Sequence, residues 1–412
     1  MDYQLEKATR QHTKDHNSRL LLRTIYEYGE ISRADLARLT RLTRATVSEV
    51  VGELIERGLV EEVGHGTSAV GRAPVLLSVV DEARLVAAIS LTNESVSGAL
   101  MNLRGGLRAQ MTLPLAQRDG ETALATVYAV AERLIAAADR PLLGIGINTP
   151  GLIDTSSGTV VRGVSFGWEE LPLGALLQAR YGLPAYVAND SHSLALAEYT
   201  FGPARGSPNL VVVKVGNGIG AGIILGGHLY TGEGYGAGEI GHMVVDPAGP
   251  PCKCGNSGCL ETLASAPAIL ARARAAGYAG RATLLRELAP DPAALALDHI
   301  AAAAERGDEA AQAVVAEAGR SLGVAVAGLV SVLNVRHVLL TGRVAARGAP
   351  LREQVQAELA RRALPALVRQ TVVEVAQLGP DAPLLGAAAP LLTYELGLER
   401  LTRRPALGKA EA

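Results

Sequence analysis

The segment that most constrains this chain is CKCGNSGCLE, which holds all three of its cysteines, Cys252, Cys254 and Cys259. Three cysteines cannot form a closed set of disulfides, and this crowding between glycines is typical of metal ligands. A structural zinc site binds four nitrogen or sulfur donors in a tetrahedron, and His242, ten residues upstream, is the candidate fourth ligand. The alternative is three unpaired thiols on a loop, but unpaired cysteines usually lie scattered in a core. We therefore expect a structural Zn²⁺ site.

The composition of the chain narrows its class. It has 412 residues and a formal net charge of −2. Its length predicts two or three domains, and its overall charge by itself gives no sign of a nucleic-acid partner. The N-terminal stretch is polar, unlike a signal peptide, and no uncharged apolar run reaches the roughly 18 residues of a membrane span. Because cysteines used for metal suit a reducing compartment, we expect a cytoplasmic protein with no membrane partner.

The N-terminal region differs from the rest in charge and pattern. Between Arg10 and Arg44 there are eight lysines and arginines against four acids, a net charge of +4. A solvated helical face is the simplest explanation of such a run, but the apolar residues beneath it have helical spacing in three successive segments. Ser32 and Thr43 are placed as helix N-caps. Two strand-like segments, LVEEVG and VLLSVV, then flank a loop.

Three helices followed by a β-hairpin predict a winged helix-turn-helix domain over residues 1–80. In that fold the beginning of the second helix of the motif enters the major groove, where arginine reads guanine and threonine or alanine contacts the thymine methyl group. The hairpin can insert into the minor groove. The predicted DNA-contacting residues are Arg33, Arg44, Ala45, Thr46, Ser48 and Arg72. Protein–protein contact is the competing use of a winged helix, and the basic bias disfavours it.

Beyond residue 80 the sequence predicts an α/β protein with a repeated arrangement. Three strand-like segments, LVAAISL, VSGALMNL and LRAQMTL, lead through helices and strands to AYVA, which ends at Asn189-Asp190. A second round begins with NLVVVKV and the turn GNGIGAG, continues through an Ala-rich helical stretch, and ends with HVLLTG and VVEVAQL. We therefore expect two related lobes with a cleft between them, residues 81–190 and 191–412, with the C-terminal segment packing back on the first lobe.

The metal motif, the winged helix and the doubled lobe together resemble the ROK family of repressors and sugar kinases, over essentially the whole chain. The most specific segment is GEIGH followed by CKCGNSGCLE, and NTPGLID, AYVANDSHSLALAE, VGNGIGAGIILGGHLY and DAPLLGAAA support it. The resemblance implies an actin-like, hexokinase-like ATPase fold. It also implies one of two activities, phosphorylation of a sugar by ATP or control of transcription by a sugar that alters operator binding.

The resemblance also implies a ligand site. Asp190 matches the catalytic base of the kinases, and Asn189, Glu239, His242 and Glu261 would contact sugar hydroxyls with it, a task that suits carboxylates and imidazole. Simpler roles are open for each: Asn189-Asp190 as a helix cap, Glu261 as a carboxylate favoured by a helix dipole, and Glu239 as a solvated loop acid. Residues 216–220 match a phosphate-binding turn, although a plain hairpin needs the same glycines.

The chain departs from the kinases at the first phosphate turn. The kinases carry an Asp-x-Gly-Gly-Thr type of loop after the first strand, whereas residues 89–94 here are ISLTNE. Ser90 stands where the Mg²⁺-organising aspartate would be, both glycines are absent, and Glu94 adds negative charge where phosphate would lie. The asparagine that family members often carry just before the tryptophan matching Trp168 is also missing.

We therefore predict a sugar-responsive transcriptional regulator, a repressor of carbohydrate genes, with no catalytic residue in use. It would bind operator DNA as a homodimer or homotetramer, because one recognition helix offers too few base contacts for specificity. Two alternatives stay open. One is a ROK-type sugar kinase, and the other is a DNA-binding protein whose ROK domain only oligomerises.

Overall fold

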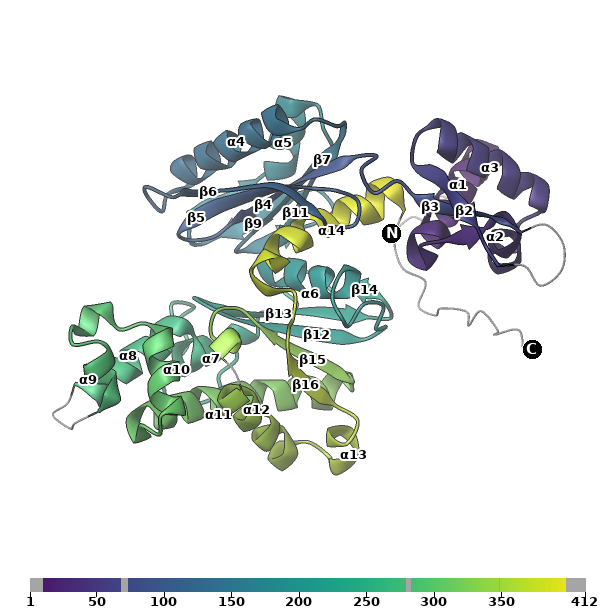
Figure 1. Cartoon of the computed structure of the whole chain (residues 1–412). Coiled ribbons are helices and arrows are strands. Elements are labelled where there is room, and N and C mark those ends of the chain that lie inside the picture. Colours follow the sequence, from purple (N-terminus) through teal and green to yellow (C-terminus); the bar gives the residue numbers. More distant parts are fainter. Residues whose placement is uncertain (1–9, 68–72, 279–282, 348, 398–412) are drawn as a thin grey trace. The chain divides into compact units, whose positions relative to one another are not determined.

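The computed structural model describes residues 10–67, 73–278, 283–347 and 349–397. They belong to two compact units, one made of residues up to 188 together with those from 387 onward, and the other of residues 189–386 (Figure 1). The predicted DNA-contacting residue Arg72 lies outside the described residues.

The first unit begins with the predicted winged helix-turn-helix, which the structure confirms. Its elements are α1 (Arg10–Tyr28), β1 (Ile31–Ser32), α2 (Arg33–Thr40), α3 (Arg44–Glu56), β2 (Val60–His65) and β3 (Val75–Val79). Both predicted N-caps form, since Ser32 accepts the amide of Asp35 and Thr43 that of Thr46. The short strand β1, which was not predicted, pairs with β3 and makes the wing sheet three-stranded, in the order β1-β3-β2.

The rest of the first unit is an α/β lobe around a five-stranded sheet of order β11-β7-β4-β5-β6. Its elements are β4 (Leu85–Leu91), β5 (Ser95–Met101), β6 (Leu107–Pro114), α4 (Gly120–Ala137), β7 (Leu142–Thr149), α5 (Leu173–Tyr181), β11 (Ala185–Asn189) and α14 (Ala382–Leu396). Helices α4 and α5 cover one face of the sheet and α14 the other (Figure 1). Gly144 and Gly146 on β7 allow this contact, because a side chain at Gly146 would collide with the Ala387 backbone.

A small separate sheet follows β7 and was not predicted. It consists of β8 (Leu152–Asp154), β9 (Thr159–Gly163) and β10 (Trp168–Leu171), in the order β10-β9-β8. Trp168 lies buried beside Phe166, and its indole nitrogen donates to the carbonyl of Gly120, 3.1 Å away. These strands are only three to five residues long, too short for their residue pattern to indicate strands.

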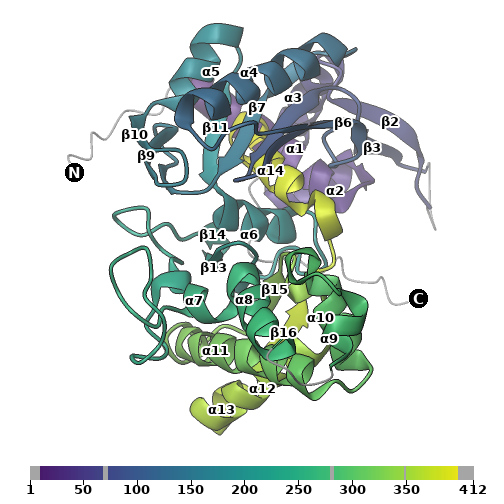
Figure 2. The ribbon, with the colours of Figure 1, turned by 90° about the vertical axis from the view of Figure 1, so that its left-hand side faces the viewer.

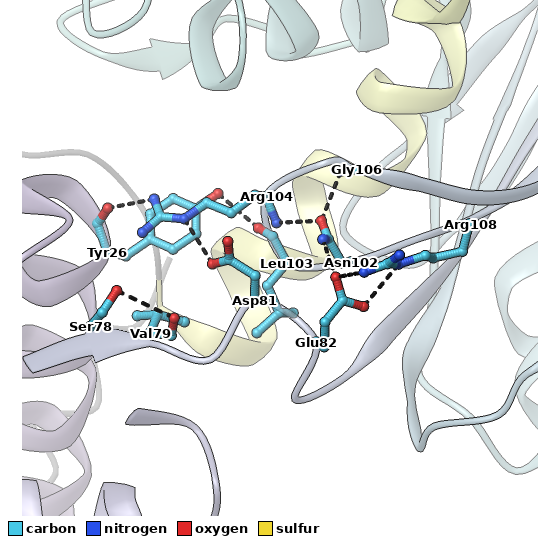
Figure 3. A network of polar contacts seen from close by, with 10 residues as sticks. All are labelled: Tyr26, Ser78, Val79, Asp81, Glu82, Asn102, Leu103, Arg104, Gly106 and Arg108. Carbon is cyan, nitrogen blue, oxygen red and sulfur yellow. Dashed lines mark hydrogen bonds and ion pairs between the residues drawn. The ribbon is translucent and has the colours of Figure 1, made fainter. Parts of the chain in front are cut away.

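The winged helix is joined to the first lobe by a polar contact at the β5–β6 turn (Figure 3). The Tyr26 hydroxyl, at the end of α1, donates to the Leu103 carbonyl at 2.8 Å. In return, Arg104 donates to the Tyr26 carbonyl at 2.6 Å, and its guanidinium lies 4.0 Å from the centre of the Tyr26 ring. Arg104 also pairs with Asp81 at 3.1 Å. We call these four residues, Tyr26, Asp81, Leu103 and Arg104, the clamp.

The second unit repeats the strand order of the first lobe. Its sheet runs β14-β13-β12-β15-β16, so β12 holds the central place that β4 holds in the first sheet, with one antiparallel and one parallel neighbour. The strands are β12 (Leu210–Val215), β13 (Ile219–Leu225), β14 (His228–Leu229), β15 (His337–Thr341) and β16 (Val372–Val375). The predicted repetition of the two lobes is therefore confirmed at the level of topology.

Helices cover both faces of this second sheet. Helix α6 (Asp190–Thr200) packs on β12 and β13 from one side, and the remaining helices lie together on the other (Figure 2). These are α7 (Leu260–Ala264), α8 (Ala266–Gly277), α9 (Leu284–Leu288), α10 (Leu297–Glu305), α11 (Glu309–Leu333), α12 (Ala349–Arg362) and α13 (Pro365–Val368). Helix α11 is apolar and long enough to span a membrane, but 56% of its most apolar stretch is buried inside this unit.

Candidate functional site

The predicted metal ligands meet in the second unit. The ligand atoms of His242, Cys252, Cys254 and Cys259 all lie within 4.8 Å of one another. The Sγ atoms of Cys254 and Cys259 are 3.6 Å apart, and so are the Sγ of Cys252 and the Nδ1 of His242. A tetrahedral ion with metal–sulfur bonds of about 2.3 Å separates its sulfur ligands by about 3.8 Å. The four side chains therefore have the spacing of a closed metal site.

The chemistry of the thiols also fits a metal ion. Burial and the two neighbouring thiols raise the pKa of Cys259 to about 12, so without a cation this thiol stays protonated at neutral pH. A bound metal ion removes that proton, because thiolates are the ligands it takes. In contrast, a hydrogen bond from the backbone of Asn256 lowers the pKa of Cys254.

The backbone of the loop is shaped around this site. Gly258 has a φ of +69°, and a side chain there would collide with the Asp246 carbonyl, so only glycine fits. The Cys252 amide donates to the Asn256 carbonyl at 2.7 Å, which closes the turn that carries the first two cysteines. Cys259 then occupies the N-cap position of α7. Cys259 is thus both a predicted metal ligand and the residue that precedes the first turn of α7.

Glu261 is held by the metal loop and by the glycine turn together. It lies in the first turn of α7, as the helix-dipole alternative anticipated. One carboxylate oxygen accepts the Ile219 amide at 3.2 Å, and the other pairs with Lys253, between two of the cysteines, at 3.0 Å. The carboxylate is therefore fixed next to the turn of residues 216–220, where it is available for a ligand hydroxyl.

Asn189 is the N-cap of α6 and Asp190 is its first residue. Both predicted roles of this pair, as a helix cap and as ligand contacts, are compatible with that position. The Asn189 side chain accepts the amides of Ser191 and His192 at 2.8 and 3.2 Å, so it caps the helix. Asp190 instead forms an ion pair with Lys214 on β12. Its side chain keeps 18% of its surface exposed, so the carboxylate can still be reached from solvent.

Glu239 lies in the second unit, just before the short 3-10 helix Ile240–His242. Solvent reaches its side chain, yet the surrounding protein raises the pKa of Glu239 by desolvation, and the carboxylates of Asp190 and Glu261 raise it further. The structure therefore brings the three predicted acidic ligands close enough to repel one another. His242 uses Nδ1 toward Cys252, which leaves Nε2 as the nitrogen that a ligand could contact.

The turn that the family resemblance matches to the first phosphate loop of the kinases lies in the first unit, and side chains form hydrogen bonds within it. Ser90 is buried and donates to the Asn148 side chain at 2.8 Å. The Thr92 hydroxyl accepts the amides of Glu94 and Ser95 at 3.2 and 3.1 Å. The amides that a glycine loop would offer to phosphate are thus bonded within the turn.

The predicted DNA-contacting residues lie mostly at the start of α3. Arg44, Ala45 and Ser48 are exposed and Thr46 is half-buried, while the opposite face of the helix is buried through Val47, Val50, Val51 and Leu54. Arg33 lies elsewhere, at the start of α2, where it pairs with Glu62 of β2 at 2.9 Å.

Three residues close to the predicted acidic ligands were not predicted: Lys214, Lys253 and His192. A lysine inside the apolar run VVVKV was the available signal for Lys214, and its place between two cysteines was the signal for Lys253. His192 is buried, its Nε2 lies 2.8 Å from the Ala237 carbonyl, and burial lowers its pKa. No sequence pattern marked it.

Known families and proteins match this architecture. Residues 86–393 match the ROK family and residues 17–69 match the MarR family. The chain is 33% identical over 387 residues to a putative xylose repressor of Caldicellulosiruptor sp. strain Rt8B.4, an alignment that covers 92% of this chain and 96% of that protein.

Solved structures agree with this match. A ROK family transcriptional regulator, a homologue of the E. coli MLC protein, superposes with a TM-score of 0.83 at 29% identity, over 94% of this chain and 98% of that one. A ROK family glucokinase from Streptomyces griseus, in complex with glucose and AMPPNP, has a TM-score of 0.66 at 27% identity. It covers 74% of this chain and 98% of its own.

Proposed function

The chain belongs to the ROK family, and on that premise we propose that it is a sugar-responsive, DNA-binding transcriptional repressor. The observation that carries this proposal is the extent of the match. The similarity to a putative xylose repressor covers 92% of the chain and so includes the winged helix, whereas the similarity to the glucokinase covers only 74%. A DNA-binding domain joined to a sugar-kinase fold suits a regulator that senses a sugar.

The effector is expected to bind where Asn189, Asp190, Glu239, His242 and Glu261 are available. Hydroxyl groups of a sugar can donate to these carboxylates and accept from the imidazole. The sugar would shift the balance between two conformations of the protein and thereby change operator affinity. Free D-xylose is the first compound to test, because a relative is named a xylose repressor.

The DNA contacts are expected from Arg44, Ala45, Thr46 and Ser48 at the start of α3 and from Arg33 at the start of α2, while the predicted contact of Arg72 lies outside the described residues. We expect two copies of the chain, or four, to bind one operator, because a single helix in the major groove supplies too little specificity. As a transcriptional regulator, the protein would act in the cytoplasm.

The metal is expected to be zinc and to be structural. Three thiolates and one imidazole are a usual structural zinc set, which leaves no open position for a substrate. The residues that would hold it also place Lys253 and Glu261, so the ion would stabilise one wall of the sugar site.

We further propose that the chain is no sugar kinase. The closed turn at Ser90 and Thr92 supports this, since phosphate needs free backbone amides and close approach. Two observations favour a kinase instead. One is the similarity to the glucokinase, and the other is Asp190, which matches the catalytic base of the kinases. A coupled assay with ATP and the sugars below decides, because turnover at about 1–100 s⁻¹ would establish a kinase.

The proposal is tested on the purified full-length chain with a panel of sugars. We expect at least one sugar to raise the melting temperature and to shift operator DNA, in a gel retardation assay, between its bound and free forms. If operator DNA is bound but no sugar affects either measurement, the ROK domain serves oligomerisation alone. If no DNA is bound, the repressor function is wrong.

A further inference from the structure

The sugar site of the second unit contains two lysines besides its three acids. Lys214 comes from β12, and Lys253 comes from the metal loop. Each contacts one acid, Lys214 pairing with Asp190 and Lys253 with Glu261. With all five groups ionised, three negative charges against two positive ones leave the site at −1. Within the described part of the chain, the acid without an ion-pair partner is Glu239.

The position of Lys214 is unusual for a lysine. It lies at the end of the central strand β12, opposite Gly220 on β13 and Thr341 on β15. Its Cε is 3.9 Å from the place where a Cβ on Gly216 would be, so the stem runs along the glycine turn toward Asp190. Only 27% of the Lys214 side chain is exposed. A cation in such a place is kept there by its partner.

This placement puts a positive charge where the glycine turn would otherwise offer its amides to a phosphate. Asp190 already takes one of the three N–H donors of this ammonium and neutralises its charge, so a phosphate group would have to share the lysine with a carboxylate that repels it. The phosphate would also bring two negative charges close to Glu239 and Glu261. A neutral hydroxyl has neither difficulty, since it can donate to the acids while the lysine pairs stay intact.

We propose that Lys214 holds Asp190 in place as an acceptor in the effector site, and that the remaining excess of acids restricts this site to uncharged sugars. Sugar phosphates and sugar acids are excluded by the net negative charge of the site, which Lys214 and Lys253 neutralise only in part. The inference rests on the proposed sugar-responsive function.

The test is calorimetric titration of the full-length protein with D-xylose, D-glucose and D-mannose, and with the 6-phosphates of the two hexoses. We expect a hexose that binds to lose at least about tenfold in affinity when it is phosphorylated, because like charges repel in a partly desolvated site. Lys214→Gln should weaken sugar binding by about tenfold or more. Lys214→Arg should stay within about threefold of the natural protein, because it keeps the charge.

The matched control is Arg369→Gln, which removes one positive charge from an exposed position of the same unit and should leave sugar affinity unchanged. A sugar phosphate that binds as tightly as its free sugar would overturn the inference while the proposed function stands. Unchanged sugar affinity in Lys214→Gln would do the same. If Lys214→Gln does not fold, the arginine variant and the phosphate comparison still decide. If neither sugars nor phosphates bind, the sugar-responsive function itself fails.

Discussion

Replacing Arg104 by alanine should loosen the winged helix from the first lobe by a predictable amount. Arg104 gives a charged hydrogen bond to the Tyr26 carbonyl, worth about 1–2 kcal/mol. Its stacking on the Tyr26 ring adds about 0.5–1 kcal/mol. The pair with Asp81, whose side chain is 45% exposed, adds about 0.5 kcal/mol. The sum is about 2–3.5 kcal/mol, and nearly all of it acts between the two domains of the first unit.

Hydrogen exchange followed by mass spectrometry measures how much the winged helix is destabilised, segment by segment. A loss of about 2–3.5 kcal/mol should accelerate exchange of the α1 to α3 amides by about 30- to 370-fold. Amides of β4 and β7 should be unaffected. Fluorescence of Trp168, the single tryptophan, which lies buried in the first lobe, should give an unchanged unfolding midpoint in urea. Tyr26→Phe removes the bond to the buried Leu103 and should have a smaller effect, about 1–2 kcal/mol.

Arg108→Ala is the matched control. Arg108 lies on β6, four residues further along, but its partner is Glu82 and it does not contact the winged helix (Figure 3). This variant should leave the α1 to α3 amides unchanged. Exchange rates within about twofold of the natural protein in Arg104→Ala would refute the reasoning, as would equal acceleration throughout the first lobe. If the clamp also transmits the sugar signal, Arg104→Ala should keep sugar affinity and lose sugar-dependent release of DNA.

Three further predictions concern other parts of the chain. Arg44→Ala should weaken operator binding by about 1–3 kcal/mol without changing the stabilisation by sugar. The control Arg57→Ala, at the far end of α3, should have little effect on operator binding. Equal losses of operator affinity in the two variants would contradict the assignment of the recognition helix. Cys254→Ser or a chelator should lower the melting temperature and abolish a bound-metal content of about one ion per chain, and an unchanged melting temperature would mean that the loop needs no metal. Burial raises the pKa of Glu198 in the folded protein, and a hydrogen bond with the Leu378 backbone offsets this only in part. The contribution of this carboxyl to the free energy of unfolding is therefore fully present below its unfolded pKa, about 4.5. It is lost as the pH rises through the pKa of the folded state. Glu198→Gln should raise the melting temperature more at pH 7.5 than at pH 4, and an equal rise at both pH values would contradict this.

Features with a local cause were predictable from the sequence. Ser32 and Thr43 cap their helices because a hydroxyl next to free amides needs no distant partner. The metal ligands were predictable for the same reason, since three of the four lie within eight residues and chemistry dictates the fourth. The repeated strand order followed from apolar runs separated by turns, although β8 to β10 were too short to show.

Features that join distant segments were not predictable. The Tyr26 hydroxyl meets a carbonyl 77 residues away, and nothing in either segment indicates the other. Lys214 was visible as an odd charge in a strand, but its partner Asp190 is 24 residues upstream. The roles predicted for Glu239 and Glu261 came from the family resemblance, because isolated acids near glycines have no specific pattern.

The repetition of one strand order in two sheets has an evolutionary consequence. It makes the β4–β5 turn and the β12–β13 turn equivalent positions in two copies of one unit, as expected if an ancestral half-length gene was duplicated and fused. The copies have diverged at this point, one into a turn closed by Thr92 and the other into a glycine turn supported by Glu261. A hairpin turn has only to reverse the chain, so either copy can change without loss of the fold. A few substitutions in one copy can therefore change the ligand that its turn binds while the fold is kept.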